Sequence, residues 1–273
     1  MQSSELFSLK GKVIIVTGGT GVLGGSFVNA IVEAGGTAVI SGIDEEACIN
    51  RADEINANGG KALGIYANVL EEAQLIAARE KIISSFGKID GLVNAAGGNV
   101  PEAVVENDAD IFSMNIDGMK KALVLNLWGT IIPSQIFGAA MATNGKGSIV
   151  NISSVSPKNA LTKVLGYSMG KAAIDIYTKW FAVEVANRYG DKIRVNAITP
   201  GFFLTEQNRT LLTNSDGSYK ERAHAIIKHT PFKKFGHPDD LKGALVYLLS
   251  DASSFVTGSE IFVDGGFTKF SGV

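Results

Sequence analysis

The chain has 273 residues and a formal net charge of −2, a length that suits one large α/β domain or two small ones. Hydrophobic residues make up 45% of the chain and charged residues 19%, so a large buried core is expected and wholesale disorder is not. Because the near-neutral charge offers no extended basic surface, we expect no nucleic-acid partner.

The sequence carries no sign of export, of a membrane span or of a metal site. The N-terminal segment MQSSELFSLKGK lacks a cationic stretch followed by an apolar core, so no secretory signal is expected. We find no apolar run long enough to span a bilayer and expect no membrane partner. A single cysteine, Cys48, excludes an intrachain disulfide, and the histidines lack metal-binding spacing. These observations predict a reducing, cytoplasmic location and no metal.

A glycine-rich turn follows the first predicted strand. Residues 12–17, KVIIVT, predict a buried strand, and GGTGVLGG at 18–25 leads into a helical pattern. Glycines let a backbone approach a pyrophosphate, which then rests on the helix N-terminus. The alternative is a tight turn without a ligand, but the flanking elements favour phosphate binding. The predicted cofactor contacts here are Gly18, Thr20, Gly21, Val22, Leu23 and Gly24.

The end of the second predicted strand, residues 37–41, bears on the choice between NAD and NADP. An acidic residue there accepts hydrogen bonds from the adenine ribose of NAD, whereas a basic residue suits the phosphate of NADP. Asp44 could reach the ribose, or it could cap the helix that begins at Glu45. Because neither arginine nor lysine lies there, we slightly favour NAD(H) over NADP(H).

Strands and helices alternate along the rest of the chain. Further strands are predicted at 62–67, 91–94, 147–152, 193–198 and 260–263, and further helices at 45–58, 70–86, 121–141, 167–189 and 238–249. This alternation predicts one doubly wound parallel sheet with helices on both faces, which binds ligands at the carboxyl ends of its strands. The long insertion at 202–232 predicts a substrate lid over that edge.

Several residues follow these strands closely enough to contact a ligand. Asn68 and Val69 follow the third strand, where Asn68 either bonds an adenine edge or caps the next helix. Small residues after the fourth strand admit a flat cofactor, or they simply pack tightly beneath the sheet. These small residues are Ala95, Ala96 and Gly97.

Tyr167 and Lys171 are spaced to share one helix face. A cation one turn away would lower the pKa of the phenol and make it a usable acid or base. Ser154, at the end of the fifth strand, could hold the substrate oxygen. Such a pair also occurs by accident on amphipathic helices, but its position at the ligand-binding edge favours the catalytic reading. Asn126, inside an apolar helix, is either a satisfied core amide or part of a proton path.

An ordered set of motifs resembles the short-chain dehydrogenase/reductase family over nearly the whole chain. The motifs are TGGTGVLG (17–24), NAAG (94–97), Asn126 in NLWGT, ISS (152–154), YSMGK (167–171), ITPG (198–201) and VDGG (263–266). The resemblance implies a single-domain Rossmann fold over 1–273 and hydride transfer between nicotinamide and a secondary alcohol or ketone. It also implies a homotetramer or homodimer that pairs the long helices and C-terminal strands.

The resemblance also assigns roles to residues. Tyr167 is the general acid/base and Ser154 orients the substrate carbonyl. Lys171 lowers the pKa of Tyr167 and holds the nicotinamide ribose, and Asn126 supports a water-linked proton relay. Further cofactor contacts implied are Asn94, Pro200, Gly201, Phe203 and Thr205. Two positions depart from the single-domain pattern, since Val22 replaces the usual middle glycine and Asn68 replaces an aspartate.

A narrower likeness points to the D-mannonate oxidoreductases of this family, which interconvert D-fructuronate and D-mannonate. It rests on GGNVPEA (97–103), NALTKVLGYS (159–168), PGFFLTEQNR (200–209) and VDGGFTKFSGV (263–273). A sugar acid needs a cation for its carboxylate, and we prefer Lys163 for that role, with Arg209 second. The implied substrate contacts are Asn99, Ser154, Lys163, Gln207, Asn208 and Arg209. The alternatives are another polyol or sugar-acid dehydrogenase, such as one acting on gluconate, and a catalytically idle dinucleotide sensor.

Overall fold

A computed structural model describes residues 3–106 and 108–272, apart from the side chains of Ser3, Ser4 and Gln207. Seven parallel strands form one sheet in the order β3-β2-β1-β4-β5-β6-β7. The strands are β1 (Val13–Thr17), β2 (Thr37–Gly42), β3 (Ala62–Tyr66), β4 (Gly91–Asn94), β5 (Gly147–Ile152), β6 (Ile193–Pro200) and β7 (Glu260–Val263). The order reverses between β1 and β4, where open α/β sheets bind their ligands. The predicted doubly wound parallel sheet is confirmed.

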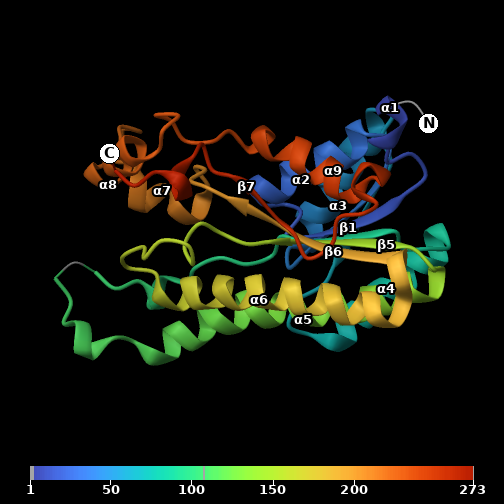
Figure 1. Ribbon diagram of the computed structural model, residues 1–273, viewed down its shortest axis with the longest axis horizontal. Helices are drawn as coiled ribbons and strands as arrows, with labels where there is room; N and C mark the ends of the chain where they lie inside the picture. The colour runs from blue at the N-terminus through green and yellow to red at the C-terminus, as the bar shows by residue number, and fades with distance from the viewer. Residues whose placement is uncertain (1–2, 107, 273) are drawn as a thin grey trace.

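Helices cover both faces of this sheet (Figure 1). One layer contains α2 (Val22–Glu33), α3 (Glu45–Ala57) and α9 (Lys242–Leu249), and the other contains α4 (Glu72–Phe86), α5 (Ile116–Asn144) and α6 (Leu165–Tyr189). The short helices are α1 (Ser3–Leu6), α7 (Glu206–Leu212) and α8 (Glu221–His229). Short 3-10 helices span Pro101–Ala103, Ile111–Ser113, Gly190–Lys192, Pro238–Leu241, Asp251–Ser253 and Phe267–Lys269.

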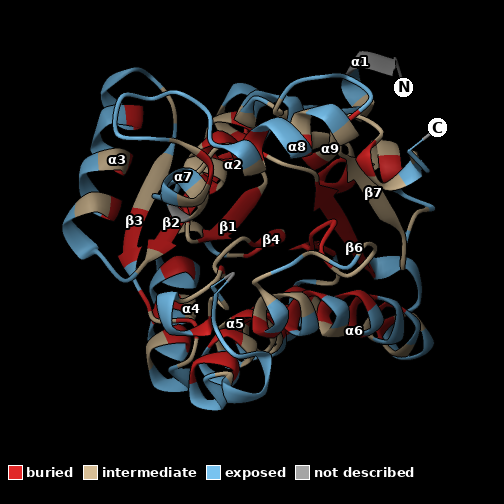
Figure 2. Cartoon of the chain, turned by 90° about the vertical axis from the view of Figure 1, so that its left-hand side faces the viewer, coloured by how far each residue is buried: buried red, intermediate tan, exposed pale blue. Residues whose placement is uncertain are grey.

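The central strands are buried on both sides, which is why they read as continuous apolar runs. In β1, Ile14 and Val16 pack into the cluster with α2 and α9, whereas Val13 and Ile15 pack into the cluster with α4 and α5. Figure 2, seen from the carboxyl ends of the strands, shows the central strands buried between helices whose outer surfaces are exposed. The carboxyl edge of the sheet therefore rests on two separate hydrophobic cores.

One expectation about α5 needs correction. By length and composition alone this helix could cross a membrane, although we expected no such apolar run. In the structure α5 packs against α6, β4 and β5, and it buries polar Asn126, Thr130 and Ser134. These contacts identify it as a core helix of the folded domain, because only part of its apolar surface faces outward.

The insertion after β6 begins at the carboxyl edge of the sheet. It carries α7 and α8, which lie at one end of the molecule (Figure 1). Leu212, Ala223 and Ile226 form a small core of their own. A bridge between Phe203 and Gly236 ties the segment to the chain that follows it.

The glycine turn brings the start of α2 into direct contact with the end of β1. Gly18 has a φ of +66°, which favours glycine. A Cβ atom on Gly24 would lie 2.0 Å from the carbonyl oxygen of Gly18, whereas one on Gly25 would have its nearest neighbour 3.9 Å away. Of these two adjacent helix positions, Gly24 therefore cannot accept a side chain without backbone movement.

We predict that Gly24→Ala destabilises the protein by about 1–3 kcal/mol or more, because the added methyl overpacks the turn. The matched control Gly25→Ala should be neutral or stabilising by up to about 1 kcal/mol, the helix-propensity difference between the two residues. Urea unfolding of both variants measures the difference. Equal stability of the two variants would contradict the close packing of this turn.

Candidate active site

Thr17 holds the loop after β4 against the glycine turn. Its Oγ1 atom accepts hydrogen bonds from the backbone N–H groups of Ala95 and Ala96, each at 3.1 Å. A Cβ on Gly18 would lie 3.0 Å from the Cα and N atoms of Ala96. The predicted cofactor residues of both segments therefore meet at the point where the strand order reverses. We did not single out Thr17 from the sequence, although it is the polar residue that ends the first apolar strand.

The glycine turn fits a dinucleotide phosphate. Gly21 is the N-cap of α2 and provides no side-chain cap, so the first N–H groups of this helix are available to an anion. Thr20 and Gly21 are exposed, Val22 and Leu23 are half-buried, and Gly24 is buried. The backbone of the turn is thus accessible to a ligand at the start of α2.

The side chains of Asp44 and Asn68 each bond a backbone N–H group close to them in the sequence. The Asp44 side chain accepts a hydrogen bond from the N–H of Ala47 at 3.0 Å and caps α3. Asn68 Oδ1 accepts from the N–H of Leu70 at 3.0 Å, while the N-cap of α4 is Glu71. Asn68 therefore forms a turn before α4. The alternative that Asn68 is the N-cap of this helix is wrong. Val69 beside it is buried.

Lys171 places a positive charge inside the protein beside Tyr167. The residue is 5% exposed, its Nζ atom donates a hydrogen bond to the carbonyl oxygen of Ile152 at 2.7 Å, and it lies 5.7 Å from the centre of the Tyr167 ring. Burial lowers the pKa of Lys171 to about 8, against the opposing effect of Asp175. The helix spacing predicted from the sequence therefore brings the pair together on α6.

The pKa of Tyr167 differs from our expectation. We expected Lys171 to lower it, but burial of the phenol raises it, and a hydrogen bond with the Ser154 side chain opposes that rise. Desolvation outweighs the neighbouring groups because the charged phenolate loses its hydration. Ser154 Oγ also accepts a hydrogen bond from the N–H of Ser156 at 3.1 Å. Ser154 and Tyr167 thus lie together although the chain between them is long. We call residues 153–164, which contain Ser154 and lead into α6, the catalytic loop.

Asn126 is a fully bonded amide next to Lys171. Its Oδ1 atom accepts from the N–H of Gly98 at 3.0 Å, and its Nδ2 atom donates to the carbonyl oxygens of Gly98 and Ala122, both at 2.7 Å. A Cβ on Gly97 would lie 2.7 Å from Asn126 Oδ1 and 3.5 Å from Lys171 Nζ. The amide therefore fixes the loop after β4 directly beside Lys171.

Asn94 lies beneath the site in a buried polar network. Its Nδ2 atom donates to Ser134 Oγ and Asn151 Oδ1, each at 2.8 Å, and Asn151 donates in turn to Thr178 at 2.9 Å. Asn94 Oδ1 has no partner among the described residues. The network joins β4 and β5 to α5 and α6. Asn94 therefore holds the carboxyl ends of these two strands against the helices beneath them.

A second buried network, which sequence reasoning missed, anchors the catalytic loop. Lys158 Nζ lies 2.8 Å from both Asp175 and Glu260. Ser153 donates to Asp175 and Thr199 to Glu260. The loop is thereby tied to α6, β6 and β7. The sequence signal for this network is the acidic residue Asp175, one helical turn after Lys171.

The residues after β6 form a compact joint between the sheet and the segment 202–232, the predicted lid. A Cβ on Gly201 would lie 2.6 Å from the Cα atom of Asp264, so the two backbones touch. Pro200 accepts a hydrogen bond at its carbonyl oxygen from the N–H of Val155 at 3.3 Å. Phe203 is buried, and Thr205 is the N-cap of α7.

The structure separates the predicted substrate residues. Asn208 caps α7: its Oδ1 accepts from the N–H of Thr205 at 2.9 Å and its Nδ2 donates to the carbonyl oxygen of Phe203 at 2.7 Å. Both ends of this amide are therefore bonded to the backbone at the start of α7, and its substrate contact stays a prediction. Arg209 is exposed and lies 3.4 Å from Glu206. The Gln207 side chain lies outside the described part of the structure.

Asn99 and Lys163 lie on the loops that border the site. Asn99 Oδ1 is buried without a hydrogen-bond partner among the described residues. Lys163 has a φ of +76°, accepts a hydrogen bond from the N–H of Val105 at 2.9 Å, and pairs through Nζ with Glu106 at 2.7 Å. The ammonium that we expected to bind a substrate carboxylate already has a carboxylate partner.

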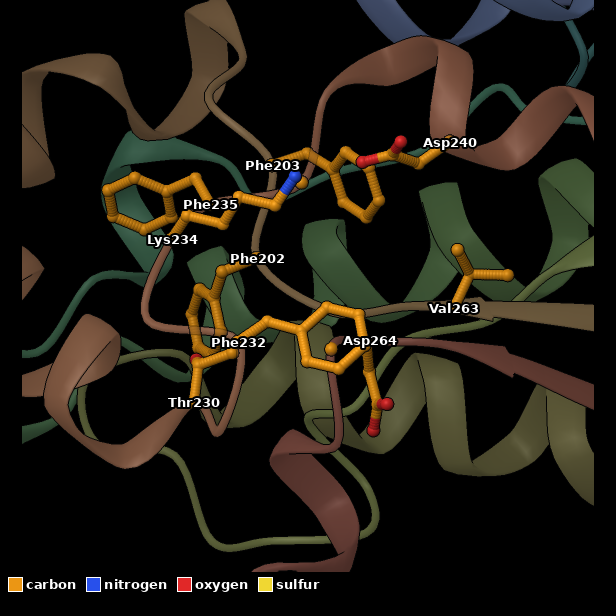
Figure 3. A pocket seen from close by; sticks show the side chains of 11 residues that line it. Phe202, Phe203, Thr230, Phe232, Lys234, Phe235, Asp240, Val263 and Asp264 are labelled. Carbon is orange, nitrogen blue, oxygen red and sulfur yellow. The ribbon is translucent and has the colours of Figure 1, made fainter.

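Across residues 3–106 and 108–272, no group of three His, Cys, Asp or Glu side chains is placed to hold a metal ion. A cavity of about 230 Å³ lies beside the joint after β6. In Figure 3, Phe203, Lys234 and Asp240 lie on one side of it, and Phe202, Phe232 and Asp264 lie on the other. Neither Ser154 nor Tyr167 lines this cavity, so it lies apart from these two predicted catalytic residues.

Comparison with known proteins places this geometry among nicotinamide-dependent oxidoreductases. A family model described as enoyl-(acyl carrier protein) reductase matches residues 21–268. UxuB of Bacillus subtilis (strain 168), an uncharacterised oxidoreductase, is 40% identical over 275 residues, which cover 97% of this chain and 98% of that one.

Two solved structures resemble the whole chain. A provisionally assigned D-mannonate oxidoreductase from Haemophilus influenza with bound NAD matches with a TM-score of 0.89 at 36% identity, covering 100% of both chains. A gluconate 5-dehydrogenase from Burkholderia cenocepacia in complex with NADP and tartrate matches with a TM-score of 0.87 at 32% identity, covering 98% of this chain and 99% of that one. The first of these relatives holds NAD and the second NADP.

The lowered pKa of Lys171 predicts a pH-dependent stability. On unfolding, this lysine regains its ordinary pKa of 10.5 from about 8, so unfolding takes up a proton between these pH values and stability rises with pH there. Lys171→Met removes this dependence. We therefore expect the stability of this variant relative to wild type to fall by about 2–3 kcal/mol between about pH 7 and pH 10.

Urea unfolding at both pH values measures this difference. Lys179→Met is the matched control, because Lys179 is an exposed lysine of the same helix. If the difference in free energy of unfolding between Lys171→Met and wild type does not change with pH, burial does not lower the pKa of Lys171.

Proposed function

Because the chain belongs to the short-chain dehydrogenase/reductase family, we propose that it oxidises and reduces a sugar acid, with D-mannonate and D-fructuronate as the preferred pair. The family consists of dehydrogenases and reductases that act on CH–OH groups with NAD(P). The observation that carries the proposal is the convergence of Ser154, Tyr167 and Lys171 at the carboxyl end of β5. The whole-chain likeness to the D-mannonate oxidoreductase structure supports the choice of substrate.

The catalytic residues divide the handling of the proton. When bound, the nicotinamide supplies or accepts a hydride at the substrate carbon. Tyr167 donates the proton during reduction, since burial keeps its phenol protonated in the resting site. Ser154 donates a hydrogen bond to the developing oxyanion. Lys171 is the cation placed to stabilise the phenolate that Tyr167 leaves behind, and Asn126 supports the path by which that proton is replaced.

The residues of the carboxyl edge suit a dinucleotide from end to end. We propose that the turn from Gly18 to Gly24 binds the pyrophosphate, that Asp44 and Asn68 lie at the adenosine end, and that the nicotinamide lies near Lys171 and the segment from Pro200 to Thr205. NAD is favoured because Asp44 follows β2 and the described loop there carries neither arginine nor lysine. The NAD-bound relative supports the same preference.

We propose that residues 1–273 form one domain in which 202–232 is a lid over the substrate. The contacts of this segment with the joint after β6 support that arrangement. The alternative substrate is gluconate or a related sugar acid, which the likeness to a gluconate 5-dehydrogenase favours. A catalytically idle dinucleotide sensor accounts less well for a complete Ser154, Tyr167 and Lys171 arrangement.

A substrate panel tests this function. We expect D-mannonate with NAD, and D-fructuronate with NADH, to give the highest kcat/KM among hexuronates, aldonates and neutral polyols, each measured with both cofactors. Tyr167→Phe should lower kcat by at least about 10²–10⁴-fold with every substrate, because it removes the acid/base. Its NADH affinity, measured by fluorescence, should stay near that of wild type.

Three outcomes would change the assignment. Preferred turnover of D-gluconate would move the substrate to the alternative, and turnover of neutral polyols alone would exclude sugar acids. Tight cofactor binding with no turnover across the panel would favour the sensor. Full activity of Tyr167→Phe would remove this residue from the acid/base role.

We propose that the protein is a homodimer or homotetramer that pairs the outer faces of α5 and α6. These two helices lie side by side on the outer surface of the molecule (Figure 1). Their exposed apolar side chains include Val124, Trp128, Leu165, Met169, Ile176, Trp180 and Val183. Large apolar side chains exposed on neighbouring helices are typical of a protein interface. The homotetramer expected from the C-terminal strands would use a second surface.

We expect Ile176→Glu to reduce the mass measured by analytical ultracentrifugation to a smaller assembly, because it places a charge in this interface. Ile49→Glu is the matched control, since Ile49 is an exposed isoleucine, 42% accessible, on α3 in the opposite helix layer. A monomeric wild type, or equal masses for both variants, would contradict the proposed interface.

A further inference from the structure

The cations around the catalytic loop differ in whether a carboxylate neutralises them. Lys163 pairs with Glu106 at 2.7 Å, and Lys158 lies between two carboxylates at 2.8 Å. Arg209 extends from the surface of α7 towards Glu206. None of these three side chains offers an unoccupied positive charge to a substrate.

Arg222 on α8 is different. Its Nη1 atom donates to Thr162 Oγ1 at 2.8 Å, and its Nη2 atom donates to the Thr162 carbonyl oxygen at 3.3 Å. The side chain is half-buried, and no carboxylate of the described residues pairs with it. Desolvation lowers the pKa of its guanidinium from the ordinary value. A guanidinium has five N–H donors, so the contact with Thr162 leaves most of them for a ligand.

The position of Arg222 suits the far end of a substrate. Thr162 belongs to the catalytic loop, which begins beside Ser154 and leads into Tyr167, and α8 lies at the same end of the sheet (Figure 1). In a sugar acid whose hydroxyl at C5 reacts beside Tyr167, the carboxylate lies several carbon atoms away. Its partner is therefore expected at the rim of the site, where lid and catalytic loop meet.

An arginine that is partly desolvated without a counter-ion costs free energy, which a bound carboxylate would offset. A carboxylate also matches the planar fork of a guanidinium through two parallel hydrogen bonds. We infer that Arg222 binds the substrate carboxylate and that this contact, rather than one with Lys163 or Arg209, selects an acidic sugar. The inference rests on the proposed function, because it requires a sugar-acid substrate.

Thr162 then has a positioning role. Its hydroxyl and carbonyl oxygens both face the guanidinium, so they orient the fork while leaving its charge uncompensated. The same contact ties α8 to the loop that carries the catalytic residues. A substrate bound to Arg222 therefore couples the lid to the reacting end of the site.

The test compares the sugar acid with its neutral amide, which keeps the hydroxyl groups and loses the charge. The probes are D-mannonate and D-mannonamide, with D-gluconate and D-gluconamide in parallel. For Arg222→Gln we expect KM for the acid to rise about 10- to 100-fold, the range for a hydrogen bond to a charged group. We expect KM for the amide, and the affinity for NADH, to change less than about threefold, within the scatter of such measurements.

Arg79→Gln is the matched control, because it removes an arginine of α4 that has Glu80 as a carboxylate neighbour, and we expect it to leave both substrates unaffected. Arg222→Lys keeps the charge without the fork and should recover part of the affinity for the acid. It also keeps the inference falsifiable if Arg222→Gln does not fold, which circular dichroism would reveal.

The outcomes separate the two proposals. If wild type turns over no sugar acid, the proposed function fails and this inference fails with it. If wild type turns over the acid and Arg222→Gln has the same KM, only the role of Arg222 is overturned. Equal losses for acid and amide would reduce Arg222 to a structural tie between α8 and Thr162. An acid-specific loss in Lys163→Met, with none in Arg222→Gln, would assign the carboxylate to Lys163.

Discussion

The buried ammonium of Lys171 is the constraint on which the candidate site depends. Moving such a charge out of water is unfavourable, and here the carbonyl oxygen of Ile152 and the carboxylate of Asp175 offset part of that cost. The hydrogen bond joins α6 to the end of β5. Because Tyr167 precedes Lys171 by one helical turn and Ser154 follows Ile152 closely, the same bond sets these two side chains beside each other.

Polar networks beneath the carboxyl edge keep this arrangement in place. Asn126 bonds the backbone of Gly98, and Asn94 joins β4 to β5 and α5. Each of these amides is buried, so loss of a partner would leave an unpaired polar group at a cost of about 1–3 kcal/mol. The geometry of the site is therefore specified by hydrogen bonds that are costly to rearrange, whereas the sheet supplies the rigid frame.

The cations at the rim of the site differ in whether a carboxylate neutralises them. Lys158 is neutralised by two carboxylates and holds the catalytic loop to β7. Lys163 is neutralised by Glu106. Arg222 bonds only neutral oxygens of Thr162 within the described structure. Arg222 therefore differs from these paired lysines in being a half-buried cation without a carboxylate among the described residues, and this is the physical reason we propose for selecting an acidic substrate.

The sequence determined the sheet, the glycine turn and the pairing of Tyr167 with Lys171, because each depends on short-range pattern. The central strands are buried on both faces and so appear as apolar runs, and the spacing of Tyr167 and Lys171 follows helix periodicity. The sequence did not predict the start of α5 at Ile116, because the N-cap Asn115 follows a stretch that has the pattern of a loop.

Only the tertiary structure decided which charges are neutralised. Thr162 and Arg222 are 60 residues apart, and Lys158 and Glu260 are 102 residues apart. Their contacts follow from the way residues 202–232 and β7 return to the carboxyl edge, which no local pattern encodes. For the same reason the backbone hydrogen bonds of Asn208 at the start of α7 and the desolvation that raises the pKa of Tyr167 could not be predicted from the sequence. Burial and counter-charge are properties of the folded surroundings, whereas residue type and spacing are properties of the chain.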